Sequence, residues 1–291
     1  MSRPTPRVLI DDLVFPECPR WHDNRLWFVD MFGHRVMTAD LDGTTEVVAE
    51  FDDRTGGLGF LPDDTPIVVL MEHRRIMRLE KDGRTSLHAD LSAIPAENLN
   101  DMIVDDVGRA YVDCIKGRPA DPTVDVGDCI VMVDPDGQYR IAAQGGLHRP
   151  NGLALTPDGR TLIAAELTMH RLTAFEIEDD GTLSNRRPFA PVPNELPDGI
   201  CLDAEGAVWV ASARTNRYVR VLPGGQITES VTVDEGKWTS ACVLGGEDRR
   251  TLFMTAAKVP PIPRGGMKGN LHESVGSIMT VRVDVAGIGR P

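Results

Sequence analysis

Four polar residues with oxygen-bearing side chains stand at matching points of the chain and could together hold a metal ion. Each begins an apolar run that is followed by a polar turn and a second apolar run; the four are Glu17, Asn100, Asn151 and Asp198. Carboxylate and amide oxygens are the ligands that calcium and similar hard cations prefer, and the set contains no His or Cys of a structural zinc site. The four residues therefore predict one divalent ion, with calcium favoured and magnesium, manganese or zinc as alternatives.

Each of these residues taken singly has a simpler interpretation. Asn and Asp side chains often cap the start of a strand through hydrogen bonds to the backbone. Four oxygen donors in register are harder to explain in that way, because an unpaired carboxylate is costly where strands crowd together and a cation removes that cost. The coincidence of position carries the metal prediction.

The positions match because the chain repeats a unit. Equivalent points fall at residues 17, 57, 100, 151, 198 and 240, in steps of 40, 43, 51, 47 and 42 residues. The clearest copy is residues 150–164, PNGLALTPDGRTLIA, which predicts an inner strand, a Pro-Asp-Gly turn and an antiparallel second strand. A period of about 40–50 residues is typical of a propeller blade.

Six copies predict an all-β fold, a six-bladed β-propeller with four-stranded antiparallel blades, as a single domain over residues 1–291. The N-terminal strand at residues 7–10 is expected to close the last blade beside residues 277–283, which protects two sheet edges. A two-sheet β-sandwich is the alternative, but it does not explain the period. The inner strands of a propeller surround a central channel, so their first residues should gather near the axis at one face.

Composition excludes several classes of function. The formal net charge is −13, which argues against nucleic acid as a partner and against an anionic membrane surface. No apolar run approaches the about 20 residues of a membrane span. A small-molecule substrate is the expected partner, and the sequence leaves open whether the chain is a monomer or a homo-oligomer.

The five cysteines are widely scattered and form no CxxC pair, and the first residues, MSRPTP, lack the apolar core of a signal peptide. Reduced thiols and a cytoplasmic location are therefore expected.

Beyond this pattern, the chain resembles the SMP-30/gluconolactonase/luciferin-regenerating-enzyme family, to which regucalcin belongs. The resemblance rests on five segments in the family's order: residues 16–21 (PECPRW), 100–101 (ND), 150–159 (PNGLALTPDG), 197–199 (PDG) and 240–246 (SACVLGG). It implies a six-bladed propeller with one divalent ion held by residues matching Glu17, Asn151 and Asp198. The residue matching Asn100 contacts the ion or the substrate.

The resemblance also implies the hydrolysis of a lactone or, in some relatives, of a phosphotriester. Because it places Asp198 at the metal and within reach of substrate, Asp198 is expected to act as general base or nucleophile. A metal ion would polarise the lactone carbonyl and lower the pKa of a bound water. Sugar-lactone hydrolases of the family often carry Arg two residues before the Asn100 position; here that residue is Asn98, which counts against an aldonolactone substrate.

Further residues are predicted around the ion. Substrate contacts are expected from Asn98, Asn100, His73 and His148. The ends of the second strands place several polar residues one ring outward, where surface salt bridges are favoured over substrate contact: Asp30, His73, Asp113 with Lys116, and Glu166. Two long loops, residues 116–128 and 258–274, are expected on the metal-bearing face, the first as a lid.

Three functions are compatible with this site. A metal-dependent lactonase is favoured. Other chemistry on the same ion, such as phosphotriester hydrolysis or isomerisation or dehydration of a sugar acid, is the second. A non-catalytic propeller that binds calcium or a partner is the third, since fold alone does not define function.

Overall fold

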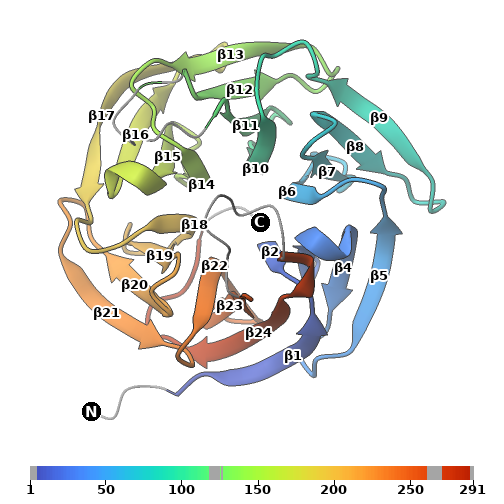
Figure 1. Cartoon of the computed structure of the whole chain (residues 1–291). Coiled ribbons are helices and arrows are strands. Elements are labelled where there is room, and N and C mark those ends of the chain that lie inside the picture. The colour runs from blue at the N-terminus through green and yellow to red at the C-terminus, as the bar shows by residue number, and fades with distance from the viewer. Residues whose placement is uncertain (1–4, 118–124, 126, 261–270, 289–291) are drawn as a thin grey trace.

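The computed structural model describes residues 5–117, 125, 127–260 and 271–288, and it shows six four-stranded antiparallel sheets arranged around a central axis (Figure 1). The predicted six-bladed β-propeller is thus confirmed. Short 3-10 turns are the only helical segments among the described residues: η1 (Met31–Gly33), η2 (Leu167–Met169) and η3 (Leu271–Glu273).

The innermost strand of every blade coincides with one copy of the sequence repeat. These strands are β2 (Pro16–His22), β6 (Thr55–Phe60), β10 (Asn98–Val104), β14 (Pro150–Leu155), β18 (Pro197–Leu202) and β22 (Lys237–Gly245). The second strands are β3 (Arg25–Asp30), β7 (Pro66–Leu70), β11 (Ala110–Ile115), β15 (Thr161–Glu166), β19 (Val208–Ser212) and β23 (Thr251–Lys258). Both sets lie where the apolar runs of the sequence predict them.

The outer half of each blade carries less apolar sequence. The third strands are β4 (Arg35–Ala39), β8 (Arg75–Leu79), β12 (Cys129–Val133), β16 (Arg171–Ile177), β20 (Arg217–Val221) and β24 (Val275–Arg282). The outermost strands are β5 (Thr45–Glu50), β9 (Thr85–Asp90), β13 (Tyr139–Gln144), β17 (Leu183–Pro191), β21 (Ile227–Thr232) and β1 (Arg7–Leu13). Exposed and half-buried residues make up all of β5 and all but one residue of β21, as expected of outer strands that face water.

The ring closes through the N-terminal strand. β1 pairs antiparallel with β24, with Arg7 opposite Thr280 and Ile10 opposite Ile278, so the sixth sheet has the order β1-β24-β23-β22. Figure 1 shows β1 running along the outer edge of this blade. The closure predicted from the sequence is confirmed. Pairing with β1 covers the edge of β24 that would otherwise be open.

The apolar core lies between neighbouring blades. The second strands are almost entirely buried, and the largest fully buried side chains include Trp209, Tyr111 and Tyr218. All five cysteines are free, and four of them are buried, as expected of small apolar side chains. The packed blades provide a rigid frame for the residues at the axis.

Every inner strand begins with an irregularity that matters for the site. The pairing of inner and second strands skips at the same place in all six blades: Glu17/Arg20, Thr55/Leu58, Leu99/Met102, Pro150/Leu153, Pro197/Ile200 and Thr239/Ala241. Such bulges leave residues out of the ladder and redirect their side chains. The skipped segments contain Asn100, Asn151 and Asp198, so the bulges direct these side chains toward the axis.

Candidate metal centre and active site

A cavity of about 640 Å³ lies where the inner strands begin. Its floor is formed by the starts of β2, β10, β14 and β18, and its walls come from the loops that join the strands at this face. This size falls within the range of small-molecule sites. The gathering of strand starts at one face, predicted from the repeat, is what the structure shows.

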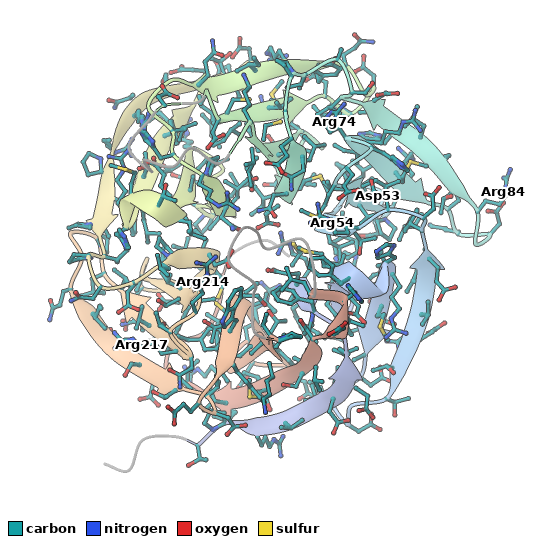
Figure 2. All side chains as sticks on the ribbon, viewed as in Figure 1. Asp53, Arg54, Arg74, Arg84, Arg214 and Arg217 are labelled. Atoms are coloured by element: carbon teal, nitrogen blue, oxygen red, sulfur yellow. The ribbon has the colours of Figure 1, made fainter. Side chains whose placement is uncertain are left out.

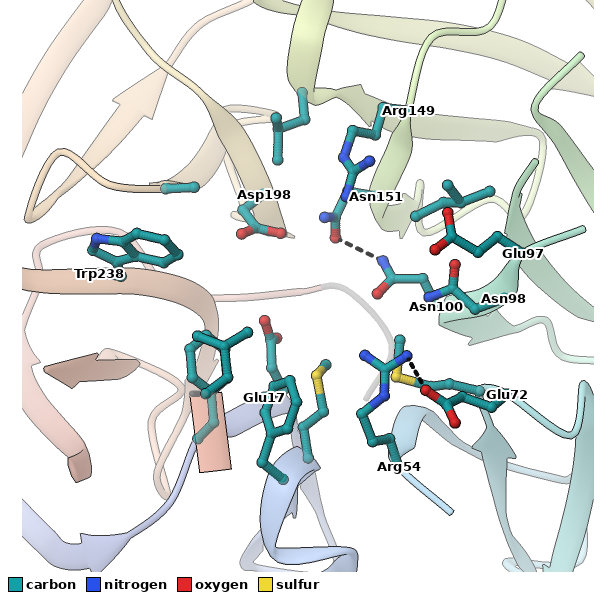
Figure 3. Close-up of a pocket in the computed structure, with 18 of the residues that line it drawn as sticks. Glu17, Arg54, Glu72, Glu97, Asn98, Asn100, Arg149, Asn151, Asp198 and Trp238 are labelled. Carbon is teal, nitrogen blue, oxygen red and sulfur yellow. Dashed lines mark hydrogen bonds and ion pairs between the residues drawn. The ribbon is translucent and has the colours of Figure 1, made fainter. Parts of the chain in front are cut away.

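The four oxygen donors predicted from the sequence all line this cavity, and Figure 3 shows them pointing toward one another from four blades. The Nδ2 of Asn100 donates to Oδ1 of Asn151 at 3.2 Å, which links two of these blades directly. The backbones of β14 and β18, which carry Asn151 and Asp198, also approach each other closely. A Cβ on Gly152 would lie 2.4 Å from the Asp198 carbonyl oxygen, so only glycine allows these two strands to meet here.

The two remaining register positions do not contribute donors. A Cβ on Gly57 would lie 2.3 Å from the backbone nitrogen of Met102, so β6 presents only backbone at this point. The Ser240 hydroxyl donates to the Pro16 carbonyl at 2.9 Å and contacts Thr255 Oγ1 at 2.8 Å. The donor set is therefore Glu17, Asn100, Asn151 and Asp198, without an equivalent from blades two and six.

The surroundings of the two carboxylates disfavour their charged forms. Burial, and next the charge of Asp198, hold the pKa of Glu17 well above its ordinary value. Burial raises the pKa of Asp198 from 3.8 to about 8, although the charges of Arg149 and Arg214 act in the opposite direction. Among the described residues neither carboxylate makes an ion pair with a cationic side chain.

These observations fit a divalent cation. Two buried carboxylates that repel each other are stabilised by a proton or by a cation, and two amide oxygens complete a donor set of the calcium type. Within the described part of the chain no three His, Cys, Asp or Glu side chains come together as a metal cluster, and the central set itself has only two carboxylates. Two carboxylates and two amide oxygens thus make a donor set of oxygen atoms alone, which suits a hard cation.

A second layer of residues fixes the donors. Oδ2 of Asp113 accepts hydrogen bonds from Nδ2 of Asn100 at 3.4 Å and from the Asp101 backbone N–H at 3.0 Å. Because the amide nitrogen of Asn100 is turned toward Asp113 and Asn151, its Oδ1 is left for the cavity. Burial, then the charge of Asp101, raises the pKa of Asp113 well above its ordinary value.

Arg20 balances the charge of Asp101 beneath the floor of the cavity. Its Nη2 donates to Oδ1 of Asp101 at 2.9 Å and to the Met102 carbonyl at 2.7 Å, and both side chains of the ion pair are only 8% exposed. Asp101 lies close enough to raise the pKa of Glu17 and of Asp198. Without Arg20, a third uncompensated carboxylate would lie beside these two.

The surface role predicted for the outward ring is wrong in part. Asp30, Asp113 and Glu166 are fully buried at the ends of their strands. Asp30 and Glu166 do make salt bridges, with Arg35 at 2.9 Å and with Arg171 at 2.8 Å, but within the fold. Asp113 makes no ion pair with any described residue and instead orients Asn100. Asp30 accepts the backbone N–H of Phe15 and Glu166 that of His148, so the segments that precede β2 and β14 contact two of these side chains.

The residues predicted to contact substrate all line the cavity. Asn98 is 8% exposed on β10, and Asn100 lies two residues further along the strand. His73 lies at the rim, where its Nδ1 is 3.6 Å from Oδ2 of Asp53, and His148 lies in the loop before β14. The structure brings the four together around the donor set; their role with a substrate stays a prediction.

Sequence reasoning missed the arginines of the cavity. Arg54, Arg149 and Arg214 line it from three different blades. Arg54 pairs with Glu72 at 3.0 Å, as Figure 3 shows, and the guanidinium of Arg214 lies 4.9 Å from the ring centre of Trp238. All three residues lie outside the repeated strand motif, in segments whose sequence does not predict whether a side chain points into the cavity or into water.

The two long loops are partly described. Gly117 and Asp128 from the first, and Leu271 and His272 from the second, line the cavity, which agrees with the predicted face. Residues 118–124, 126 and 261–270 lie outside the described residues, and with them the predicted lid. No helix in the described part of the chain has the length and apolar character needed to cross a membrane.

Comparison with known proteins agrees with this picture. A family model described as the SMP-30/Gluconolactonase/LRE-like region matches residues 15–258. A 6-deoxy-6-sulfogluconolactonase of Pseudomonas putida is 27% identical over 96% of this chain and 94% of its own.

Solved structures agree as well. A gluconolactonase of Xanthomonas campestris superimposes with a TM-score of 0.75 at 25% identity, covering 98% of this chain and 96% of its own. A regucalcin of Agrobacterium tumefaciens, described as a calcium-binding protein, gives a TM-score of 0.79 at 20% identity, covering 100% and 99% of the two chains.

Proposed function

This chain belongs to the SMP-30/gluconolactonase/LRE-like family, and from that premise we propose that it is an enzyme that opens a small lactone with the help of one divalent metal ion. One observation carries the proposal: two buried carboxylates and two amides converge at the floor of a cavity, and no cationic side chain of the described residues pairs with the carboxylates. The lactonase names of relatives that match nearly the whole chain support the reaction class.

Glu17, Asn100, Asn151 and Asp198 would hold the ion. Calcium is the favoured ion because all four ligands are oxygens, and magnesium, manganese or zinc are the alternatives. A calcium-binding relative with the same fold supports this choice. When bound, such an ion polarises a carbonyl and lowers the pKa of a water molecule.

The chain's own residues divide the remaining tasks. Glu17 is only 9% exposed and is the most buried of the four donors, so we assign it to holding the ion and balancing its charge. Asp198 is less buried and faces the cavity, so its carboxylate can take the proton of an attacking water or attack the carbonyl itself. Asn98, His73 and His148 surround the space above the donors and can hydrogen-bond to substrate hydroxyls.

The test is acid release from a panel of sugar, aliphatic and aromatic lactones, measured at constant pH. Each rate is taken on the untreated enzyme, after EDTA, and after the return of single divalent ions. We expect activity toward one class of lactone that disappears with EDTA and returns with one ion. Activity that is untouched by complete metal removal would contradict the metal role, and a flat panel from fully metal-loaded protein would contradict the reaction.

Two variants separate the roles of the carboxylates. Asp198→Asn should abolish turnover while the protein stays folded, whereas Glu17→Gln should first weaken metal binding, so that excess ion restores part of the activity. Asp42→Asn is the matched control, because Asp42 lies in an exposed turn between β4 and β5, outside the cavity lining, and accepts the Thr44 backbone N–H at 2.9 Å. Near-normal lactonase activity of Asp198→Asn would show that the catalytic assignment is wrong.

A further inference from the structure

We propose that Arg149 and Arg214, with Trp238, form a cationic subsite beside the metal donors, and that the substrate is a lactone carrying an anionic group away from its ring carbonyl. This inference rests on the proposed lactonase function and names its substrate class. The anionic group is an oxyanion that a guanidinium can bind: a carboxylate, a phosphate or a sulfonate.

Arg149 supplies the main contact. It precedes β14, its backbone is left-handed with φ +52°, and its N–H donates to Oδ2 of Asp128 at 2.8 Å, so the point from which the side chain leaves is fixed. The side chain lines the cavity, and Figure 3 shows it directed inward from the side of β14 and β18. Among the described residues its guanidinium makes neither an ion pair nor a hydrogen bond.

A half-buried guanidinium with unused donors over a cavity is a receptor for a planar or tetrahedral oxyanion. Asp198 does not fill this role, because no ion pair within 4.0 Å joins it to Arg149, although the Arg149 charge lowers the pKa of Asp198. A metal ion held by Asp198 would engage that carboxylate further. The donors of Arg149 then remain for the substrate.

Arg214 extends the positive charge along the same wall. It follows β19 with φ +64°, and its guanidinium lies 4.9 Å from the ring centre of Trp238 at the start of β22. Stacking on an aromatic face holds a guanidinium in place without neutralising it. The Arg214 charge also lowers the pKa of Asp198, so both arginines act on the same part of the site. Figure 2 shows Arg214 on the inner side of its blade, in contrast to Arg84 at the outer edge of the ring.

Three acidic residues that line the cavity, Asp53, Glu72 and Asp128, have partners other than the Arg149 guanidinium. On the side of the cavity opposite Arg149, Glu72 forms an ion pair with Arg54 at 3.0 Å. Asp53 accepts the backbone N–H groups of Arg54 and His73, each at 2.7 Å. Asp128 accepts two backbone N–H groups, from Lys116 and from Arg149, each at 2.8 Å. These three acids are thus engaged by the fold and do not pair with the Arg149 guanidinium.

This geometry fixes how a substrate would lie. The ring carbonyl belongs above the four oxygen donors, and a charged substituent points toward Arg149 and Arg214. Blade three offers the neutral Asn98 on the opposite side. A neutral lactone can occupy the same cavity but leaves the hydrogen-bond donors of Arg149 unused, which lowers its affinity relative to the charged one.

The experiment compares matched pairs of lactones on the metal-loaded enzyme. D-Glucono-1,4-lactone and D-glucaro-1,4-lactone differ only by the carboxylate at carbon 6, and D-glucono-1,5-lactone and its 6-phosphate differ only by the phosphate. We expect the wild-type enzyme to favour the charged member of at least one pair in kcat/KM. Arg149→Met should lower this charged-to-neutral ratio by about ten-fold or more, mainly through KM, because a charge-assisted contact is lost.

Further variants make the result specific. Arg149→Lys should restore part of the ratio, Arg214→Gln should lower it less, and raising the salt concentration should reduce it in the wild type. Arg84→Gln is the control, since the Arg84 side chain is 81% exposed at a distant turn and should leave the ratio unchanged. An equal loss for both members of a pair in Arg149→Met, or a wild-type preference for the neutral members, overturns the subsite.

A binding measurement separates this proposal from the lactonase proposal. Calorimetry on metal-loaded protein compares 6-phospho-D-gluconate with D-gluconate, which share the same hydroxy acid end. Tighter binding of the phosphate that is lost in Arg149→Met supports the subsite even if no lactone is hydrolysed, and the proposed function alone would then have failed. Equal binding of both acids overturns the subsite even if lactones are hydrolysed.

Discussion

Replacing Asp198 by asparagine is expected to stabilise the metal-free protein at neutral pH, although the same change abolishes activity. In the folded protein the pKa of Asp198 is about 8, against an ordinary value of 3.8. A raised acid pKa means that the folded state binds the proton more tightly than the unfolded state does. Its contribution to stability is complete at low pH and is lost as the pH rises from about 4 to 8.

The size of the effect follows from these values. At pH 7 the unfolded carboxyl is ionised, whereas the folded one must keep a proton, which costs up to about 4 kcal/mol of stability. Asparagine does not titrate and avoids this cost. For 291 residues the unfolding entropy is about 0.6 kcal/mol per kelvin, so the metal-free variant should melt about 6 °C above the metal-free wild type.

The assay is thermal unfolding of both proteins after EDTA, at pH 4, 5.5 and 7, with Asp42→Asn as the control. The difference in Tm should be small at pH 4 and should grow toward pH 7. Saturating calcium should reverse the order at pH 7, because only the wild type keeps the full donor set and gains binding energy from the ion. A variant that is less stable than the wild type at pH 7 without metal, or a difference that does not depend on pH, would refute the reasoning.

Two further predictions concern the layer beneath the donors. Arg20→Met should destabilise the protein by about 3–5 kcal/mol, because it leaves the buried Asp101 carboxylate without its partner; adding Asp101→Asn should recover much of this loss in denaturant unfolding, and a double variant no better than the single one would contradict the charge argument. Asp113→Leu should weaken calcium binding by about ten-fold or more in calorimetry, because Asn100 loses the acceptor that turns its Oδ1 toward the cavity. Asp113→Asn keeps an acceptor oxygen and should bind calcium more tightly than Asp113→Leu; equal affinities would show that Asp113 does not orient Asn100.

The sequence predicts the fold of this chain well, because each blade carries its own copy of the signal. An apolar run, a turn and a second apolar run recur six times, and the register of those copies identifies Glu17, Asn100, Asn151 and Asp198 as neighbours at the axis. The structure adds a physical reason for this: bulges at the starts of β10, β14 and β18 leave Asn100, Asn151 and Asp198 out of the ladder, whereas Glu17 stays paired with Val29 next to the bulge of β2.

The site residues that the sequence does not predict are brought to the cavity by tertiary structure. Arg149 and Arg214 lie in connecting segments, where an arginine normally reaches into water, yet in the folded ring both line the cavity. Asp113 looks like a strand end at the surface, but it is fully buried and accepts hydrogen bonds from Asn100 and Asp101 of the neighbouring β10. Such contacts join different blades or loops, so neither periodicity nor local composition predicts them.

The central claim, that one ion at the four oxygen donors supports lactone opening, is tested most directly by titrating the metal-free enzyme with calcium. Bound metal and the turnover of the best lactone are measured on the same samples, for the wild type and for Glu17→Gln. Turnover should rise in proportion to bound ion, level off at one equivalent per chain, and shift to higher calcium in Glu17→Gln together with binding. Full turnover of the metal-free wild type, or a Glu17→Gln curve identical to that of the wild type, would contradict the account.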